Sequence, residues 1–195
     1  KRQVISSVEH HAALDPAHWL ADSDGFNLTL VAAANDGAIT PEALRAALGD
    51  DPSDVALVSI MLANNEVGTI NDIPALVEVT REFGITFHTD AVQAPMWLQV
   101  NFAQLGVCAM SVSGHKIGGP QGVGALIMSR DCIATPLIHG GGQERDLRSG
   151  TLDTPGIVGF AAALTELAQS RAEITQRVHA LRDSLVAGVQ EIDSE

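Results

Sequence analysis

Short apolar runs alternate with stretches of helical periodicity along most of this chain. Apolar runs of this length, bounded by turn residues, predict strands, and the longer periodic stretches predict helices. The expected strands are residues 4–7, 27–31, 55–61, 85–88, 109–113 and 124–129. The expected helices are residues 10–20, a helix that opens at residues 40–42, residues 73–83 and one long helix from about residue 155. This alternation predicts an α/β domain with a mostly parallel sheet.

The ends of two predicted helices carry clear signals. Thr40 offers a capping oxygen, and Pro41 stands in the first turn, where no backbone N–H is needed. Gly84 is expected to end the helix that begins at Ile73. The apolar run 55–61 is continuous, which is typical of a strand covered on both faces. Its sheet is therefore expected to lie between layers of helices.

Polar residues follow three of the predicted strands. The segments are Asn64–Glu66, Asp90–Gln93 and Ser113–Lys116. In parallel sheets ligands bind at the carboxyl ends of the strands, which meet at one edge. We therefore expect these segments to form a binding site together, although Asn64 and Glu66 could simply shape their turn.

Lys116 is the only lysine besides the first residue, whereas the chain has nine arginines. It lies in a short segment with Ser113, His115 and glycines on both sides. A lysine amine can form a Schiff base with an aldehyde, and pyridoxal phosphate is the most common aldehyde cofactor. The alternative is a solvated lysine in a loop.

Other residues could meet the remaining needs of pyridoxal phosphate. Asp90 could place a carboxylate against the ring nitrogen, and His10 or His11 could stack on the ring. Donors for the phosphate could come from residues that each lie beside a glycine, namely Ser113, His115 and Thr151.

Composition and charge exclude several other classes. Hydrophobic residues make up 46% of the 195 residues, so the chain has ample material for a core. The net charge of −13, from 24 acidic and 11 basic residues, argues against nucleic acid as a partner. No apolar run reaches the length of a membrane span, and no signal peptide is evident.

Cys108 and Cys132 both lie in apolar stretches. We expect two buried, unpaired thiols rather than a disulfide or a metal pair, and a cytoplasmic location follows from that expectation. No pair of cysteine and histidine residues has a spacing typical of metal ligands, so no metal site is expected. His88 is expected to be a buried histidine in a strand.

Several segments together resemble one enzyme family. The segment Ser113–Lys116, with the glycine-rich run up to Leu126, resembles the cofactor-lysine segment of the class V aminotransferase group. More narrowly, the chain is similar to the cysteine desulfurases in four places, namely Glu9–His10, Asn64–Gly68, Asp90–Gln93 and His139–Thr151. The resemblance covers about residues 4 to 160. It implies the large domain of fold-type-I pyridoxal phosphate enzymes, a three-layer sandwich.

The resemblance also implies roles for single residues. Lys116 would bind the cofactor aldehyde, and His10 would stack on the ring and help to move protons. Asp90 would pair with the ring nitrogen, Gln93 would hydrogen-bond the phenolic oxygen, and Asn65 would lie near that oxygen and the substrate carboxylate. Ser113 and His115 would hold the phosphate. Thr151 would reach the phosphate of the neighbouring subunit of a homodimer.

Parts of the family pattern are missing. The glycine- and threonine-containing turn that completes the phosphate site would lie upstream of residue 1, and the nucleophilic cysteine and an arginine for the substrate carboxylate would lie beyond residue 195. We therefore expect a segment cut at both ends, with a partial cofactor domain over residues 1–155. Residues 156–195 would form a helix that leads toward a small domain.

The full-length protein is thus expected to remove sulfur from L-cysteine, giving L-alanine and an enzyme persulfide that passes to a sulfur-acceptor protein, as in iron–sulfur cluster assembly. The isolated segment is expected to be inactive. Alternatives are a selenocysteine lyase, another member of the class V group, or a fragment without catalytic function.

Overall fold

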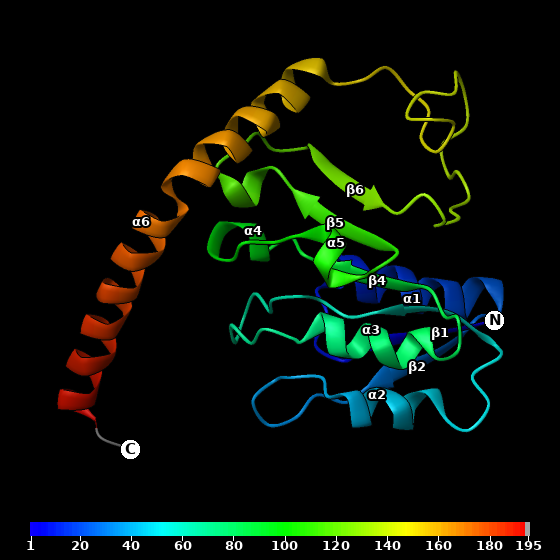
Figure 1. Cartoon of the computed structure of the whole chain (residues 1–195), viewed down its shortest axis with the longest axis horizontal. Coiled ribbons are helices and arrows are strands. Elements are labelled where there is room, and N and C mark those ends of the chain that lie inside the picture. Colours follow the sequence, from blue (N-terminus) through cyan, green and yellow to red (C-terminus); the bar gives the residue numbers. More distant parts are fainter. Residues whose placement is uncertain (194–195) are drawn as a thin grey trace.

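The computed structural model describes residues 1–193 and centres on one six-stranded sheet (Figure 1). The strands are β1 (Arg2–Ser6), β2 (Asn27–Val31), β3 (Val55–Ser59), β4 (Phe87–Asp90), β5 (Ala109–Ser113) and β6 (Gly124–Met128). Their order across the sheet is β2-β1-β3-β4-β5-β6. The first five pair in parallel, and β6 runs antiparallel to β5. The predicted α/β class with a mostly parallel sheet is confirmed.

Six α-helices and one 3₁₀ helix are present among residues 1–193. They are α1 (His11–Asp24), α2 (Pro41–Leu48), α3 (Ile73–Arg81), α4 (Ala94–Trp97), α5 (Phe102–Leu105), η1 (His115–Ile117) and α6 (Thr154–Ile192). The helix α6 passes α4 and η1, and its carboxyl half projects away from the sheet (Figure 1). No described helix is long and apolar enough to cross a membrane.

The predicted helix starts follow from capping. The Thr40 hydroxyl accepts a hydrogen bond from the Ala43 N–H, and Pro41 opens α2. Asp72 and Asp153 cap α3 and α6 in the same way, again with a proline in the first turn. These local hydrogen bonds satisfy N–H groups that have no partner inside the helix, so the boundaries could be predicted without tertiary contacts.

Two apolar clusters hold the layers together. The larger one lies between the sheet and the helices α2 and α3, and includes Val4, Val31, Leu44, Leu48, Val58, Ile60, Ile73 and Leu76. The smaller one joins the start of α6 to η1 through Ile117, Phe160 and Leu167. The second cluster therefore fixes the segment that carries Lys116.

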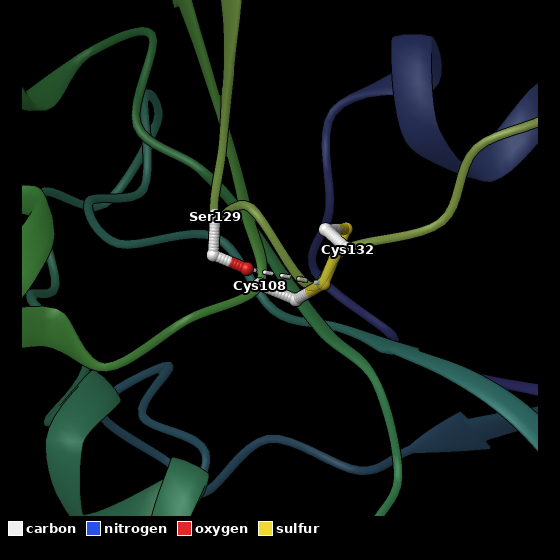
Figure 2. The surroundings of a disulfide bond; sticks show 3 residues. All are labelled: Cys108, Ser129 and Cys132. Atoms are coloured by element: carbon white, nitrogen blue, oxygen red, sulfur yellow. Dashed lines mark hydrogen bonds between the residues drawn. A yellow bond between two sulfur atoms is a disulfide. The ribbon is translucent and has the colours of Figure 1, made fainter.

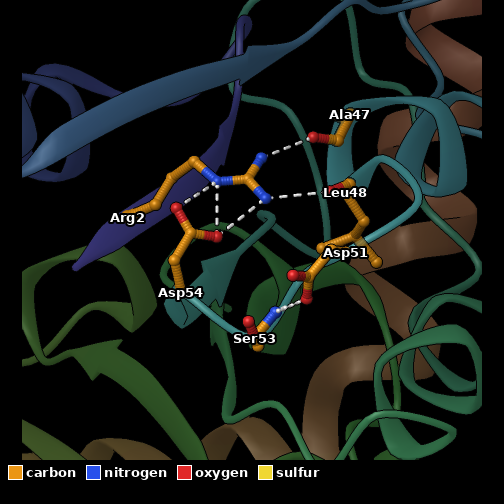
Figure 3. A network of polar contacts seen from close by, with 6 residues as sticks. All are labelled: Arg2, Ala47, Leu48, Asp51, Ser53 and Asp54. Atoms are coloured by element: carbon orange, nitrogen blue, oxygen red, sulfur yellow. Dashed lines mark hydrogen bonds and ion pairs between the residues drawn. The ribbon is translucent and has the colours of Figure 1, made fainter.

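Arg2 ties the first strand to the end of α2, as Figure 3 shows. Its guanidinium group donates to the carbonyl oxygens of Ala47 and Leu48 at 2.9 and 2.8 Å, and it pairs with Asp54. A cation at the carboxyl end of a helix satisfies its last carbonyls and favours the helix dipole. Nearby, hydrogen bonds from Ser53 hold the pKa of Asp51 below its usual value.

The expectation of unpaired cysteines is wrong. Cys108, just before β5, and Cys132, in the segment after β6, form a disulfide, and the Ser129 hydroxyl lies 3.9 Å from the Cys108 sulfur (Figure 2). Neither cysteine is fully buried. The two lie together because the antiparallel pairing of β5 with β6 brings residues 24 positions apart side by side. The cytoplasmic location thus loses its support from unpaired thiols.

Other differences from the predicted elements are small. Helices α4 and α5 and the 3₁₀ helix η1 were not predicted, because four residues or fewer give too little periodicity. The third strand ends at Ser59 instead of Met61, and α1 continues to Asp24, where Gly25 ends it in the left-handed conformation.

Candidate functional site

The carboxyl ends of four adjacent parallel strands meet at one edge of the sheet. The strand order places β1, β3, β4 and β5 next to one another. His10 follows β1, Asn65 follows β3, Asp90 ends β4 and Lys116 follows β5. Asp90 is the register partner of Ser111 in β5. The end of β5, which leads to Lys116, therefore lies beside the Asp90 backbone. The topology therefore brings these four sequence-predicted residues to the same edge.

Lys116 lies in the middle of the 3₁₀ helix η1. Its neighbour Ile117 is buried against Phe160 and anchors the segment, whereas the Lys116 side chain is exposed. Within residues 1–193 the ammonium group forms no hydrogen bond or ion pair. This amine is therefore held on an anchored backbone and is open to an incoming carbonyl compound.

Gly114 makes the close packing of that segment possible. A Cβ atom there would lie 2.9 Å from the Val123 side chain and 3.0 Å from the Pro120 carbonyl oxygen. Backbone hydrogen bonds from Gly114 to Val123 and from Gly119 to Gly114 close the turn. The glycine is required for space, since its backbone is in the ordinary helical region.

Asp90 is fixed by its own backbone surroundings. Its side chain is only 8% exposed, and one carboxylate oxygen accepts the Val92 N–H at 2.8 Å. The Asp90 carbonyl accepts the Leu62 N–H at 2.8 Å, and the adjacent Thr89 hydroxyl donates to the Ile60 carbonyl. The carboxylate is thus rigidly held at the strand end, as a partner for a ring nitrogen must be.

His88 lies two residues before Asp90, on the same face of β4. One ring nitrogen is 2.8 Å from the Ser59 hydroxyl and the other is 2.9 Å from the Ser111 hydroxyl. Burial lowers the pKa of His88, and the nearby Asp90 raises it by a smaller amount. His88 is therefore a neutral strand histidine that bridges β3 and β5. The predicted position in a strand is confirmed, but the side chain is only half-buried.

Glu9 was missed as a functional residue by sequence reasoning. It is 6% exposed, and burial raises its pKa to about 8, with a further increase from Asp90. The sequence signal was a single acidic residue between an apolar strand and a helix cap, next to His10. A surface glutamate gives the same local pattern, so the burial could not be read from it.

His10 caps α1, with its Nδ1 accepting the Ala12 N–H at 3.1 Å. In the neutral ring the proton then lies on Nε2. The imidazole is exposed, so it can lie over a flat ligand. The second candidate for stacking, His11, instead pairs with Asp15 on the helix surface.

The other predicted residues fall into three sets. Ser113 and His115 lie together, with 2.7 Å between the hydroxyl oxygen and Nδ1. Asn65 and Gln93 stand at strand ends and form no side-chain hydrogen bond with the described residues. Thr151 lies in the exposed segment that joins β6 to α6.

Asn64 shapes the turn after β3, as the sequence allowed. Its side-chain oxygen accepts the N–H groups of Glu66 and Val67, and its amide donates to the Val8 carbonyl. This turn places Asn65 next to the end of β1.

An exposed amine, a fixed carboxylate, an imidazole and a hydrogen-bonded serine and histidine can together bind a carbonyl compound that carries a basic ring and an anionic group. Among residues 1–193, no three His, Cys, Asp or Glu side chains gather as candidate metal ligands.

The chain is similar to several cysteine desulfurases. It is 50% identical over 194 residues to an IscS-like cysteine desulfurase of Mycobacterium tuberculosis, covering 99% of this chain and 49% of that protein. It is 43% identical to the cysteine desulfurase IscS of Methanosarcina thermophila, covering 98% of this chain and 46% of that protein. The chain thus spans about half the length of these curated relatives.

Solved structures agree with this relation. A NifS-like protein superposes with a TM-score of 0.92 at 38% identity, covering 99% of this chain and 53% of that one. DndA from Streptomyces lividans superposes with a TM-score of 0.85 at 34% identity, covering 96% and 53%. The family model for class V aminotransferases matches residues 1–195. The chain therefore belongs to the class V aminotransferase family.

Proposed function

We propose that this chain is the central part of a cysteine desulfurase, whose full-length form removes sulfur from L-cysteine and releases L-alanine. The observation that carries the proposal is the amine of Lys116 at the same sheet edge as the fixed carboxylate of Asp90. Relatives named as cysteine desulfurases support it.

Class V aminotransferases and cysteine desulfurases use pyridoxal phosphate, and the residues of this site fit that cofactor. The free Lys116 amine matches its aldehyde, and the buried Asp90 carboxylate matches its ring nitrogen. When bound, the cofactor supplies a ring that accepts electrons from a bond breaking at the substrate α-carbon.

The chain's own residues would prepare that chemistry. Asp90 would place a carboxylate at the ring nitrogen, and an opposite charge there would favour the protonated ring. His10 would cover the ring and exchange a proton at Nε2, because Nδ1 is engaged with the Ala12 N–H. Gln93 and Asn65, which form no side-chain hydrogen bond within residues 1–193, would bind the phenolic oxygen and the substrate carboxylate.

The phosphate would be held by Ser113 and His115, which already form a pair. Thr151, in the exposed segment between β6 and α6, would serve the phosphate of a second subunit. The segment that carries Thr151 exposes Ile133 and Leu137, which are 94% and 92% exposed. Large apolar side chains in such positions favour burial in a homodimer interface.

The sulfur step needs a thiolate that attacks the substrate sulfur. The carbon–sulfur bond breaks, the sulfur joins the enzyme thiol as a persulfide, and alanine is left. Cys108 and Cys132 cannot supply this thiolate while they form a disulfide. We therefore place the nucleophilic cysteine outside residues 1–195, followed by transfer to a sulfur-acceptor protein. A similar solved structure, titled SspA in complex with cysteine, supports cysteine as the substrate.

Borohydride reduction followed by peptide mapping tests the cofactor assignment in the full-length protein. The pyridoxyl label is expected on Lys116 and should be absent from the Lys116→Arg variant. A label on another residue would overturn the assignment. Alanine formation from L-cysteine, compared with L-selenocysteine at equal concentration, separates a desulfurase from a selenocysteine lyase.

A further inference from the structure

Glu9 is a buried carboxyl group at the candidate site that has only half of its hydrogen bonds. Oε1 accepts the Met61 N–H at 2.5 Å, and Oε2 is buried without a partner among the described residues. An ionised carboxylate in this position would leave a negative charge that is largely uncompensated, which is costly. A neutral acid fits the same position at lower cost.

The contacts around Glu9 join the ends of neighbouring strands. Glu9 reaches from the end of β1 to Met61 after β3, and Asn64 reaches back from β3 to the Val8 carbonyl. Asn71 donates to the Met61 carbonyl at 2.8 Å. Because His10 directly follows Glu9, the same contacts fix the position of His10 relative to the turn of Asn65.

Among residues 1–193, the acidic group that acts on Glu9 from another element is Asp90, at the end of β4. The Ser6 hydroxyl at the end of β1 and the Met61 N–H after β3 also face Glu9, and their hydrogen bonds lower its pKa by less than burial raises it. Burial, aided by Asp90, raises the pKa of Glu9 to about 8. Near neutral pH, Glu9 then keeps its proton.

We propose that Glu9 is a positioning residue that acts as a neutral carboxylic acid: it ties the His10 turn to the end of β3 and leaves the negative charge of the site to Asp90. This inference rests on the proposed function for its link to the cofactor. The contacts themselves do not depend on any ligand.

The first test compares Glu9→Gln with Glu9→Ala in the full-length protein. Glutamine keeps the acceptor for the Met61 N–H and carries no charge, so cofactor affinity should stay within about threefold of the unmodified protein. Alanine removes the bond to a buried N–H and should weaken cofactor binding by about tenfold or more. Glu166→Gln, on the exposed face of α6, is the matched control and should change nothing.

The second test measures unfolding as a function of pH. Since the pKa of Glu9 is raised in the folded state, the unfolded chain loses this proton first as the pH rises. The contribution of Glu9 to the free energy of unfolding is therefore at its full value below about pH 4.5. It decreases between about pH 4.5 and about pH 8 and is constant above that. The melting temperature of Glu9→Gln, relative to the unmodified protein, should therefore rise across this window, whereas Glu166→Gln should show no such trend.

Two results would overturn the inference. One is a Glu9→Gln protein that loses the cofactor as strongly as Glu9→Ala, since this would show that the charge is needed. The other is a melting difference that does not change with pH. The pH trend should also persist in the Lys116→Arg background without cofactor, so it separates a failure of this inference from a failure of the proposed function.

Discussion

At the scale of single residues, the candidate site depends on which groups carry charge and which do not. Asp90 and Glu9 are both buried acids, and burial raises the pKa of Glu9 to about 8. His88 is neutral between two hydroxyl groups. A single negative charge is thus placed where a protonated ring nitrogen would bind.

Replacing Asp90 by asparagine should remove that charge and keep the size of the side chain. We expect alanine formation in the full-length protein to slow by roughly a hundredfold, which corresponds to about 3 kcal/mol in the transition state. Cofactor occupancy, measured by absorbance, should fall less, because Lys116 and the phosphate donors remain. The exposed Asp24→Asn is the control. An unchanged rate at full occupancy would show that Asp90 is not the ring partner.

Replacing Gly114 by alanine should test the packing under Lys116. The added Cβ would meet the Val123 side chain and the Pro120 carbonyl, so we expect a loss of about 1–3 kcal/mol in the free energy of unfolding. Gly188→Ala is the matched control, because nothing lies within 4 Å of that position in α6. There alanine should stabilise the helix by at most about 1 kcal/mol. Denaturant unfolding of both variants measures the contrast, and equal effects would contradict it.

At the scale of elements, the antiparallel pair of β5 and β6 decides the path of the following segment. It brings Cys132 to Cys108 and so fixes the start of the segment that leads to Thr151 and α6. The residues from 129 to 153 contain no strand or helix, so the disulfide is the strongest constraint on their first part.

Reducing this disulfide should destabilise the protein. The bond closes a loop with a sequence separation of 24, for which chain entropy predicts about 3 kcal/mol. Denaturant unfolding with and without dithiothreitol measures the loss, and thiol counting before reduction checks that the bond is present. The double variant Cys108→Ser, Cys132→Ser should match the reduced protein and should not respond to dithiothreitol. A response in that variant would mean that the reductant acts elsewhere.

At the scale of the whole molecule, the exposed apolar residues of the segment after β6 and the position of Thr151 both favour a dimer with shared sites. Thr151 lies in the exposed segment between β6 and α6, and its proposed role at the phosphate of a second subunit can be tested with a mixed dimer.

Mixing two inactive variants tests this arrangement. Lys116→Arg removes the amine, and Thr151→Asp places a negative charge against the phosphate. If Thr151 serves the partner's site, a mixed dimer contains one native site, and an equal mixture should recover about one quarter of the unmodified activity. The assay is alanine formation after co-expression. If the mixture forms alanine no faster than the two variants alone, Thr151 does not contribute to the site of the partner subunit.

The sequence by itself determined the α/β alternation, the capped start of α2 and the unusual lysine at a strand end, because these depend on residues close in the chain. It could not determine that Glu9 is buried against Met61, 52 positions away, or that Cys108 pairs with Cys132. Burial and pairing depend on which strands become neighbours. The tertiary structure decided them, since strand order and direction set the distance between residues that are remote in sequence.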